Sequence, residues 1–233
     1  MKKIIEKIEK LMFPHYACAF CGRETPDGEL CDACRKFLIV PKVCDICGEH
    51  ISDDSTICMS CKEYKRNFDK SLSVAEYNQT TAAAVMALKY AGKRYLATDF
   101  AKLLAQKYVE SGFDADIVCS VPSSKERLKE RGFDHAKDIA KEFCKMTGLE
   151  YKDLLVKIKH TEHQTELSRE QRLVNLEGSF AAQNVTEIKG KKILIVDDVF
   201  TTGSTLSCCA KALRKAKPAK IFCLTVAKTV LEK

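Results

Sequence analysis

The chain lacks any long uninterrupted apolar run. No stretch of its 233 residues approaches the roughly 18 to 20 consecutive apolar residues that a membrane-spanning helix requires. Its first residues, MKKIIEKIEKLMF, place charges where a secretory signal peptide has a continuous apolar segment. Low-complexity segments are also absent from the sequence. These absences predict a folded protein without a membrane span, located in the cytoplasm, and they leave its oligomeric state open.

The first part of the chain also lacks an excess of charge of either sign. Residues 1–70 hold 12 Lys and Arg against 12 Asp and Glu, so the whole formal net charge of +7 comes from residues 71–233. If eight cysteines bind two Zn²⁺ ions as thiolates, they add eight negative charges and the ions add four positive ones, which lowers the net charge to +3. Net charge alone is therefore weak support for nucleic-acid binding.

Cysteine, by contrast, is abundant. The chain has 13 cysteines, of which eight form Cys-x-x-Cys pairs. An odd total in a chain without a secretory leader favours metal binding over disulfides. The remaining five lie among apolar neighbours and are expected to be buried free thiols: Cys119, Cys144, Cys208, Cys209 and Cys223.

The paired cysteines repeat at a regular spacing that is typical of zinc sites. Nine residues separate the first two pairs and ten separate the last two, which predicts two sequential zinc ribbons, with interleaved ligation as the alternative. The expected ligands are Cys18, Cys21, Cys31 and Cys34 in the first ribbon, and Cys44, Cys47, Cys58 and Cys61 in the second. Because every ligand is sulfur, no position is open for water, and both zinc ions are expected to be structural. The ribbons carry no excess of basic residues, which favours a scaffold role or protein contact over nucleic-acid contact.

Three regions follow from these patterns. Residues 1–16 are predicted to form an amphipathic N-terminal helix, residues 17–66 a double zinc ribbon, and residues 67–233 an α/β domain. In the last region, short β-branched runs alternate with helical patterns, which predicts a doubly wound parallel sheet. Strands are expected at 71–77, 116–121, 154–158, 191–198 and 219–227, and helices at 81–90, 98–109, 135–148 and 203–216.

One short stretch, ILIVDDVFTTGST at residues 193–205, concentrates the chemistry. A buried strand is expected to end at Asp197 and Asp198, followed by a loop of small hydroxyl residues that opens a helix. Backbone N–H groups at such a helix start favour a phosphate, and adjacent carboxylates can accept hydrogen bonds from a vicinal diol. The natural ligand is therefore a sugar phosphate. The alternative is an ordinary strand whose acids cap the next helix.

Two further segments are candidates for binding loops. VPSSKERLKERGFDH, residues 121–135, follows another strand and alternates cations with glutamates, so the alternative is a solvated helical turn. The polar stretch at 160–180 is too long for an ordinary connection and is expected to be a lid or binding loop that includes Arg169 and Arg172. Its His160 and His163 are not expected to bind a metal.

The 193–205 run resembles the 5-phosphoribosyl 1-pyrophosphate (PRPP) motif of type I phosphoribosyltransferases. This resemblance implies that Asp197 and Asp198 are the catalytic pair that holds the ribose hydroxyls, with Mg²⁺ bound together with PRPP. It also implies that the ligands of the phosphate and pyrophosphate are Val199, Thr201, Thr202, Gly203, Ser204, Thr205, Pro122, Ser123, Arg127 and Arg131. A general base is not evident, since His135, His163 and Glu166 are all weak candidates.

Taken together with the leading ribbons and the polar pattern from Gln164 to Phe180, these motifs resemble the ComF family. One departure is Asp134-His135, where the family more usually has Asn-Gln. The resemblance implies a role in natural competence, with single-stranded DNA and a competence helicase as partners. Three functions remain open: a phosphoribosyltransferase of unknown acceptor, a nucleic-acid-binding or DNA-uptake factor that uses the fold as a binding or regulatory module, and an assembly role for the ribbons.

Overall fold

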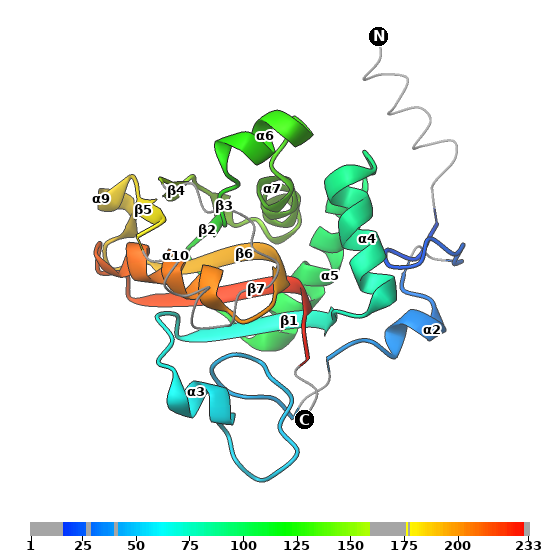
Figure 1. Ribbon diagram of the computed structural model, residues 1–233, viewed down its shortest axis with the longest axis horizontal. Helices are drawn as coiled ribbons and strands as arrows, with labels where there is room; N and C mark the ends of the chain where they lie inside the picture. Colours follow the sequence, from blue (N-terminus) through cyan, green and yellow to red (C-terminus); the bar gives the residue numbers. More distant parts are fainter. Residues whose placement is uncertain (1–15, 27–28, 40–41, 159–175, 177, 231–233) are drawn as a thin grey trace.

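A five-stranded parallel sheet forms the centre of the molecule (Figure 1). The computed structural model describes residues 16–26, 29–39, 42–158, 176 and 178–230. In spatial order the strands are β1 (Lys70–Glu76), β7 (Lys220–Lys228), β6 (Lys192–Phe200), β2 (Ile117–Ser120) and β3 (Glu150–Tyr151). Every adjacent pair is parallel. The predicted doubly wound α/β fold is therefore confirmed.

Helices cover both faces of this sheet (Figure 1). On one face pack α4 (Gln79–Tyr90), α5 (Leu96–Ser111) and α7 (His135–Thr147), and on the other α10 (Ser204–Arg214) and the short α9 (Val185–Ile188). Alternate residues of β6 serve the two sides: Leu194 joins the cluster under α5 and α7, whereas Ile193 joins the cluster under α10. Burial on both faces explains why β6 begins as an unbroken apolar run.

The helices begin and end where the sequence offers caps. The side chain of Asn78 accepts hydrogen bonds from the N–H groups of Thr80 and Thr81 at the start of α4. At the other end, α7 stops at Gly148, whose φ of 75° is a left-handed conformation that favours glycine. A further short helix, α6 (Lys125–Arg131), buries none of its residues.

The two cysteine-rich segments join the sheet on different sides. Each contains one short helix, α2 (Asp32–Arg35) in the first and α3 (Met59–Glu63) in the second. Phe20 of the first segment packs on Phe100 of α5, with ring centroids 6.3 Å apart. Ile51 of the second segment lies in the cluster that contains α10. Each segment therefore completes a different part of the core.

Two elements differ from the sequence expectation. The segment expected as a strand at 154–158 contains β4 (Leu155–Lys157), which pairs antiparallel with β5 (Phe180–Ala182) in a separate two-stranded sheet. In addition, β6 continues past the two aspartates to Phe200, because β7 runs beside it as far as Lys228. The aspartates thus lie within the strand and not beyond it.

Most of the unpaired cysteines are buried, as predicted. Cys119, Cys144, Cys209 and Cys223 are buried free thiols, and burial raises the pKa of each, to about 12 for Cys144. Cys208 differs, because it is partly exposed on α10.

Three further expectations have simple outcomes. Among the described residues, no helix combines the length and apolar character needed to cross a membrane. The predicted helix at residues 2–12 lies outside the described residues. The domain boundaries after residues 16 and 66 stay predictions.

Candidate functional site

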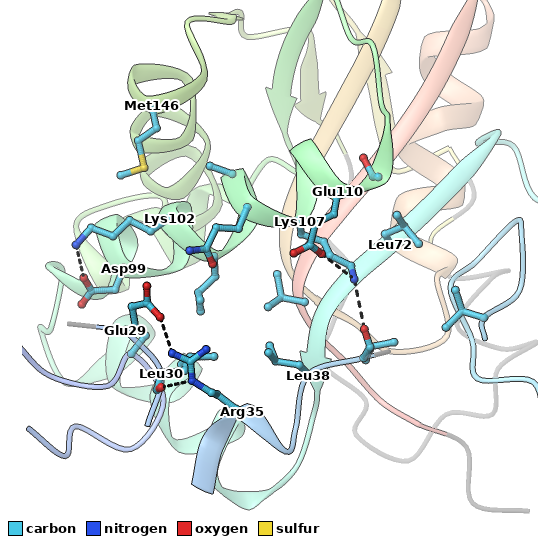
Figure 2. Close-up of a pocket in the computed structure, with 18 of the residues that line it drawn as sticks. Glu29, Leu30, Arg35, Leu38, Leu72, Asp99, Lys102, Lys107, Glu110 and Met146 are labelled. Carbon is cyan, nitrogen blue, oxygen red and sulfur yellow. Dashed lines mark hydrogen bonds and ion pairs between the residues drawn. The ribbon is translucent and has the colours of Figure 1, made fainter. Parts of the chain in front are cut away.

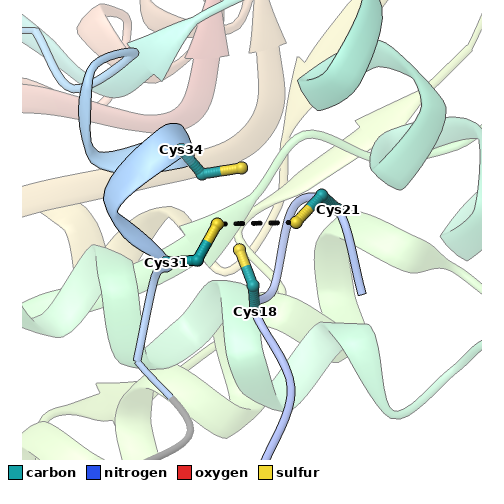
Figure 3. Close-up of side chains that lie close together, drawn as sticks. All are labelled: Cys18, Cys21, Cys31 and Cys34. Carbon is teal, nitrogen blue, oxygen red and sulfur yellow. Dashed lines mark hydrogen bonds between the residues drawn. The ribbon is translucent and has the colours of Figure 1, made fainter. Parts of the chain in front are cut away.

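The eight paired cysteines form two compact tetrads, and Figure 3 shows the first of them. In each tetrad the four sulfur atoms lie within 4.8 Å of one another. Cys21 and Cys31 are 3.6 Å apart, as are Cys47 and Cys58. A tetrahedral zinc ion with bonds of about 2.3 Å to sulfur places its ligands about 3.8 Å apart, so both tetrads fit zinc. Ligation is sequential, which rules out the interleaved alternative.

Asp198, the second acid of the motif, is enclosed. It is 4% exposed, is ion-paired with Lys89 of α4, and lies 3.6 Å from Nε2 of His135 in α7. Burial by itself would raise the pKa of this carboxyl, but the charge of Lys89 and a hydrogen bond from His135 outweigh burial and hold the pKa well below its usual range. The sequence predicts two carboxylates that are both open to a diol. Asp198 does not fit this prediction, because its carboxylate already has a cationic partner.

Asp197 lies in a different environment. It is partly buried, and its Oδ1 accepts a hydrogen bond from the backbone N–H of Asp198 at 2.9 Å. Burial and the neighbouring negative charge of Asp198 raise its pKa well above the usual range, and Lys89 offsets this only in part. The two acids are thus pushed apart in pKa, so that Asp198 is ionised where Asp197 tends to keep a proton.

A ring nitrogen of His135 and one oxygen of each aspartate lie within 4.8 Å of one another. Arg131 lies 3.2 Å from Nδ1 of His135. Since a guanidinium can only donate, Nδ1 accepts, and the imidazole proton belongs on Nε2, which faces Asp198. Two carboxylates suit Mg²⁺, which is commonly held by one or two carboxylates together with substrate phosphates. Lys89 occupies that side of Asp198, so a cation fits there only after Lys89 has moved.

The loop after β6 has the features of an anion site. Gly203 precedes α10 with a φ of 75°, and the N–H of Ser204, the first residue of the helix, donates to Oγ1 of Thr202 at 3.4 Å. A Cβ at this position would lie 2.4 Å from Cζ of Phe200, so the close approach of that ring also requires glycine. Thr201 is exposed, Thr202 is partly exposed, and the hydroxyls of Thr202 and Ser204 are 2.7 Å apart. A helix start beside the exposed Thr201 favours a phosphate.

The second predicted loop lies at the end of β2. The N–H of Ser123 donates to Oδ2 of Asp134 at 3.0 Å, which ties the loop to the start of α7. Arg131 stacks over the Tyr90 ring, 4.5 Å from its centroid, and donates to the Tyr90 hydroxyl. Arg127 and Arg131 are both partly buried. Of the two predicted arginines, Arg131 is held by Tyr90 and His135.

Two cavities lie in different parts of the protein. One of about 460 Å³ is lined by Pro122, Ser123 and Asp134, at the carboxyl end of β2. A larger one of about 920 Å³ lies between the first ribbon, β1 and α5, where Arg35 pairs with Glu29 at its rim (Figure 2). Ligands of parallel α/β sheets bind at the carboxyl ends of the strands, and the loops with reactive groups lie there. We therefore place the functional site at that edge and not in the larger cavity.

Comparison with known proteins agrees with this architecture. The family model described as "Phosphoribosyl transferase domain" matches residues 98–230, and the one described as "Double zinc ribbon domain" matches residues 8–62. The chain belongs to the phosphoribosyl transferase domain family. The second match, together with the two cysteine tetrads, supports two structural zinc sites in this phosphoribosyl transferase family member.

Three named relatives match most of the chain. Competence protein F of Haemophilus influenzae is 26% identical over 212 residues, which cover 87% of this chain and 93% of the relative. Competence protein ComFC of Bacillus subtilis is 28% identical over 214 residues, covering 86% and 85%. DNA utilization protein YhgH of Salmonella typhimurium is 26% identical over 204 residues, covering 84% and 89%. The predicted resemblance to the ComF family is confirmed.

One solved structure that matches part of the chain is the glutamine PRPP amidotransferase from B. subtilis. It is 24% identical, with a TM-score of 0.39, over 55% of this chain and 25% of that one. The family member described here thus spans about a quarter of that enzyme's length.

Sequence reasoning missed Lys89. It lies in a helical pattern, and nothing in that pattern indicates that its partner is the buried Asp198, over a hundred residues away. Sequence reasoning also missed Arg66, whose side chain reaches the loop after β6. His163, Glu166, Arg169 and Arg172 of the predicted lid lie outside the described residues.

Proposed function

We propose that this chain binds Mg²⁺·PRPP at the carboxyl edge of its sheet. The observation that carries this proposal is the loop after β6. The start of α10, a left-handed Gly203 and the exposed Thr201 closely follow a pair of aspartates. The 5′-phosphate fits the N–H groups of residues 201–205, and the ribose diol fits the acids. The fold supports the proposal, because the chain belongs to the phosphoribosyl transferase domain family.

Binding a diol at the aspartates requires a rearrangement. Lys89 has to leave Asp198 so that a ribose hydroxyl can donate to this carboxylate, while Asp197 can accept a second hydroxyl once it has lost its proton. Lys89 is then a free cation beside the bound substrate, where it stabilises the charge of the pyrophosphate. Mg²⁺ bound with the pyrophosphate supplies further neutralisation of that charge.

We propose that the loop after β2 receives the pyrophosphate. Ser123 lines the cavity at the end of β2 and would supply a hydroxyl. Arg127 lies in the adjoining helix α6 and would supply a cation. Departure of pyrophosphate leaves an oxocarbenium-like sugar, which the surrounding carboxylates stabilise. The acceptor that then attacks is open, and so is turnover itself.

Calorimetric titration with PRPP and Mg²⁺ tests the proposal. We expect binding to the wild type, and its loss when Asp197 and Asp198 are both replaced by Ala. Asp54→Ala, a change at a fully exposed acid of the second ribbon, is the matched control and should bind as the wild type does. A wild type that does not bind PRPP overturns the proposal. Pyrophosphate release, measured with bases, nucleosides and DNA oligomers, then tests transfer.

A second function has its own support. Relatives are named for competence and DNA utilization, and we propose a similar role in the uptake or handling of single-stranded DNA. Tyr95 is 45% exposed and follows Lys93 and Arg94, and Tyr90, 52% exposed, has Arg131 over one face of its ring. Exposed aromatic rings interleaved with cations are typical of single-strand binding, in which bases stack on the rings.

Fluorescence polarisation with single-stranded oligomers, repeated at several salt concentrations, tests this second function. Tyr95→Ala and the pair Arg127→Gln with Arg131→Gln should each weaken binding, the arginine pair with a smaller salt dependence. Equal affinity in wild type and variants counts against it.

A competence helicase is the protein partner that we propose for the ribbons. Because both ribbons share core clusters with the sheet, removing residues 1–65 would expose the core. Met59 is 66% exposed on α3, so Met59→Glu in the full chain is a cleaner probe of partner binding. If Met59→Glu captures the purified helicase as well as the wild type does, the surface around Met59 is not the helicase-binding site.

A further inference from the structure

The second zinc ribbon is tied to the phosphate loop, residues 201–205, by a single arginine. Arg66 follows the last cysteine of that ribbon by five residues. Its Nη1 donates to the carbonyl oxygen of Thr202 at 2.9 Å, and its Nη2 donates to Oγ of Ser60 at 3.2 Å. Ser60 lies in α3, next to Cys61. One rigid, planar guanidinium therefore spans the distance from a zinc-binding helix to the loop.

Residues that follow Arg66 hold the helix behind the loop. The backbone N–H and Nδ2 of Asn67 both donate to Oγ of Ser207, at 3.2 and 3.0 Å, in the first turns of α10. At the far end of α10, Nε of Arg214 donates to the carbonyl of Asn67 at 3.0 Å, and its Nη2 pairs with Asp69 at 2.6 Å. The segment after the second ribbon thus runs along α10 and fixes both of its ends.

A third connection passes through Lys228 at the end of β7, which is only 1% exposed. Its ammonium donates to the carbonyl of Cys47 at 3.3 Å and pairs with Glu49 at 3.2 Å. It also lies 3.6 Å from the centroid of the Phe200 ring, the ring that packs against Gly203. Two of the three partners of this buried charge come from the second ribbon. Without that ribbon, the ammonium would lose the acceptors that a buried charge needs.

The first ribbon leads elsewhere. Phe20 packs on Phe100 of α5, and Leu38 forms an antiparallel bridge with Ala75 of β1. Arg35, the arginine beside its last cysteine, donates to the carbonyl of Leu30 and so turns back on its own ribbon. The two ribbons therefore offer a matched pair, in which one contacts the phosphate loop and the other braces α5 and β1.

We propose that Arg66 is a positioning residue through which the second zinc site holds the phosphate loop in its binding shape. Zinc bound by Cys58 and Cys61 fixes α3, α3 fixes Ser60, and the guanidinium carries that position to the carbonyl of Thr202. A loop held from outside in this way presents its N–H groups without first having to order them, which favours anion binding. The effect on PRPP affinity rests on the proposed function, whereas the effect on loop order does not.

Hydrogen exchange of the full-length zinc-bound protein tests this without any ligand. We expect Arg66→Met to speed exchange of the amides in residues 201–207 roughly tenfold, the loss of one charge-assisted hydrogen bond. Arg66→Lys should give an intermediate rate, since an ammonium cannot reproduce the fork. Arg35→Met is the control and should leave these amides unchanged. Amides of β2 should be unaffected in all three variants, which separates a local role from general loosening.

A second pair of variants keeps the test decisive if Arg66→Met folds poorly. Cys58→Ser should lower the zinc content from two to one and speed exchange of residues 201–207, whereas Cys31→Ser should lower it equally and leave those amides unchanged. Equal effects of the two cysteine variants, or no effect of Cys58→Ser, would overturn the proposal.

PRPP titration of the same variants distinguishes this inference from the function on which it rests. If the wild type binds PRPP, Arg66→Met should weaken binding at least fivefold and Arg35→Met should not. A wild type that fails to bind removes the proposed function, while the exchange data still decide whether the second ribbon holds the loop.

Discussion

Lys89 of α4 and Asp198 of β6 form an ion pair inside the protein, with side chains 17% and 6% exposed. The pair closes the acid that a ribose hydroxyl would have to reach. It also provides that acid with a charge partner while no substrate is bound. The free protein can therefore keep an ionised carboxylate at the centre of its site without leaving it uncompensated.

Replacing Lys89 should reveal how much the fold depends on this pair. Lys89→Met leaves the Asp198 carboxylate buried without its strongest partner, so we expect a loss of about 3 kcal/mol in the free energy of unfolding. Lys102→Met is the control, because Lys102 is 57% exposed and forms a surface pair with Asp99. Its loss should be below about 1 kcal/mol. Urea unfolding of the wild type and the two variants measures both losses of stability. Equal stability of the wild type and Lys89→Met would contradict the prediction for Lys89.

The adjacent acids should respond to pH in opposite directions. The raised pKa of Asp197 stabilises the fold fully below the unfolded value of about 3.9, and this contribution is lost as the pH rises towards the folded pKa. The lowered pKa of Asp198 contributes above about pH 3.9, and that contribution is lost as the pH falls. Asp197→Asn should therefore be more stable relative to the wild type at pH 7 than at pH 4.

Asp198→Asn serves as the opposite case and should be destabilised at pH 7. Its deficit should shrink on acidification, as the wild-type carboxylate is itself protonated. Urea unfolding at several pH values measures the stability of each variant relative to the wild type. If this difference changes with pH in the same direction for both variants, the two environments have been assigned incorrectly.

Gly203 should be less replaceable than Gly190, another left-handed glycine. At Gly190, where φ is 70° and an added Cβ meets nothing within 4 Å, alanine should cost about 1 kcal/mol through the backbone alone. Gly203→Ala adds a collision with the Phe200 ring and should cost more. Thermal unfolding compares the two. If Gly203→Ala loses no more stability than Gly190→Ala, the Phe200 ring can move aside at little energetic cost.

Loss of one zinc ligand should remove one metal ion and not two. Cys21→Ser disrupts the first tetrad only, because the two tetrads are sequential. We therefore expect its zinc content, measured by mass spectrometry, to fall from two to one per chain. A content of zero would indicate that the sites depend on each other.

Local patterns predicted the elements whose burial is simple. The apolar start of β6 and the regular Cys-x-x-Cys pairs both constrain their surroundings strongly, and the structure contains a central strand and two tetrads there. The extension of β6 to Phe200 could not be predicted, since it depends on the length of β7 beside it. A strand of two residues such as β3 carries no periodicity at all.

Long-range pairs account for what was missed at the site. Lys89 and Asp198 are brought together by the packing of α4 against the sheet, and Arg66 meets Thr202 across 136 positions of sequence. Neither Lys89 nor Arg66 lies in a motif. In the sequence around it, each looks like an ordinary lysine or arginine at the protein surface. The acids and the small loop were recognisable because neighbours in sequence form them, whereas their cationic partners come from distant elements.

Each ribbon supplies apolar side chains to the core on its own side of the sheet. We therefore expect folding to depend on zinc, because a chain made in zinc starvation would leave apolar patches uncovered on both sides of the sheet. Such chains would be substrates for chaperones and proteases, so the amount of folded protein in a cell would follow its zinc supply.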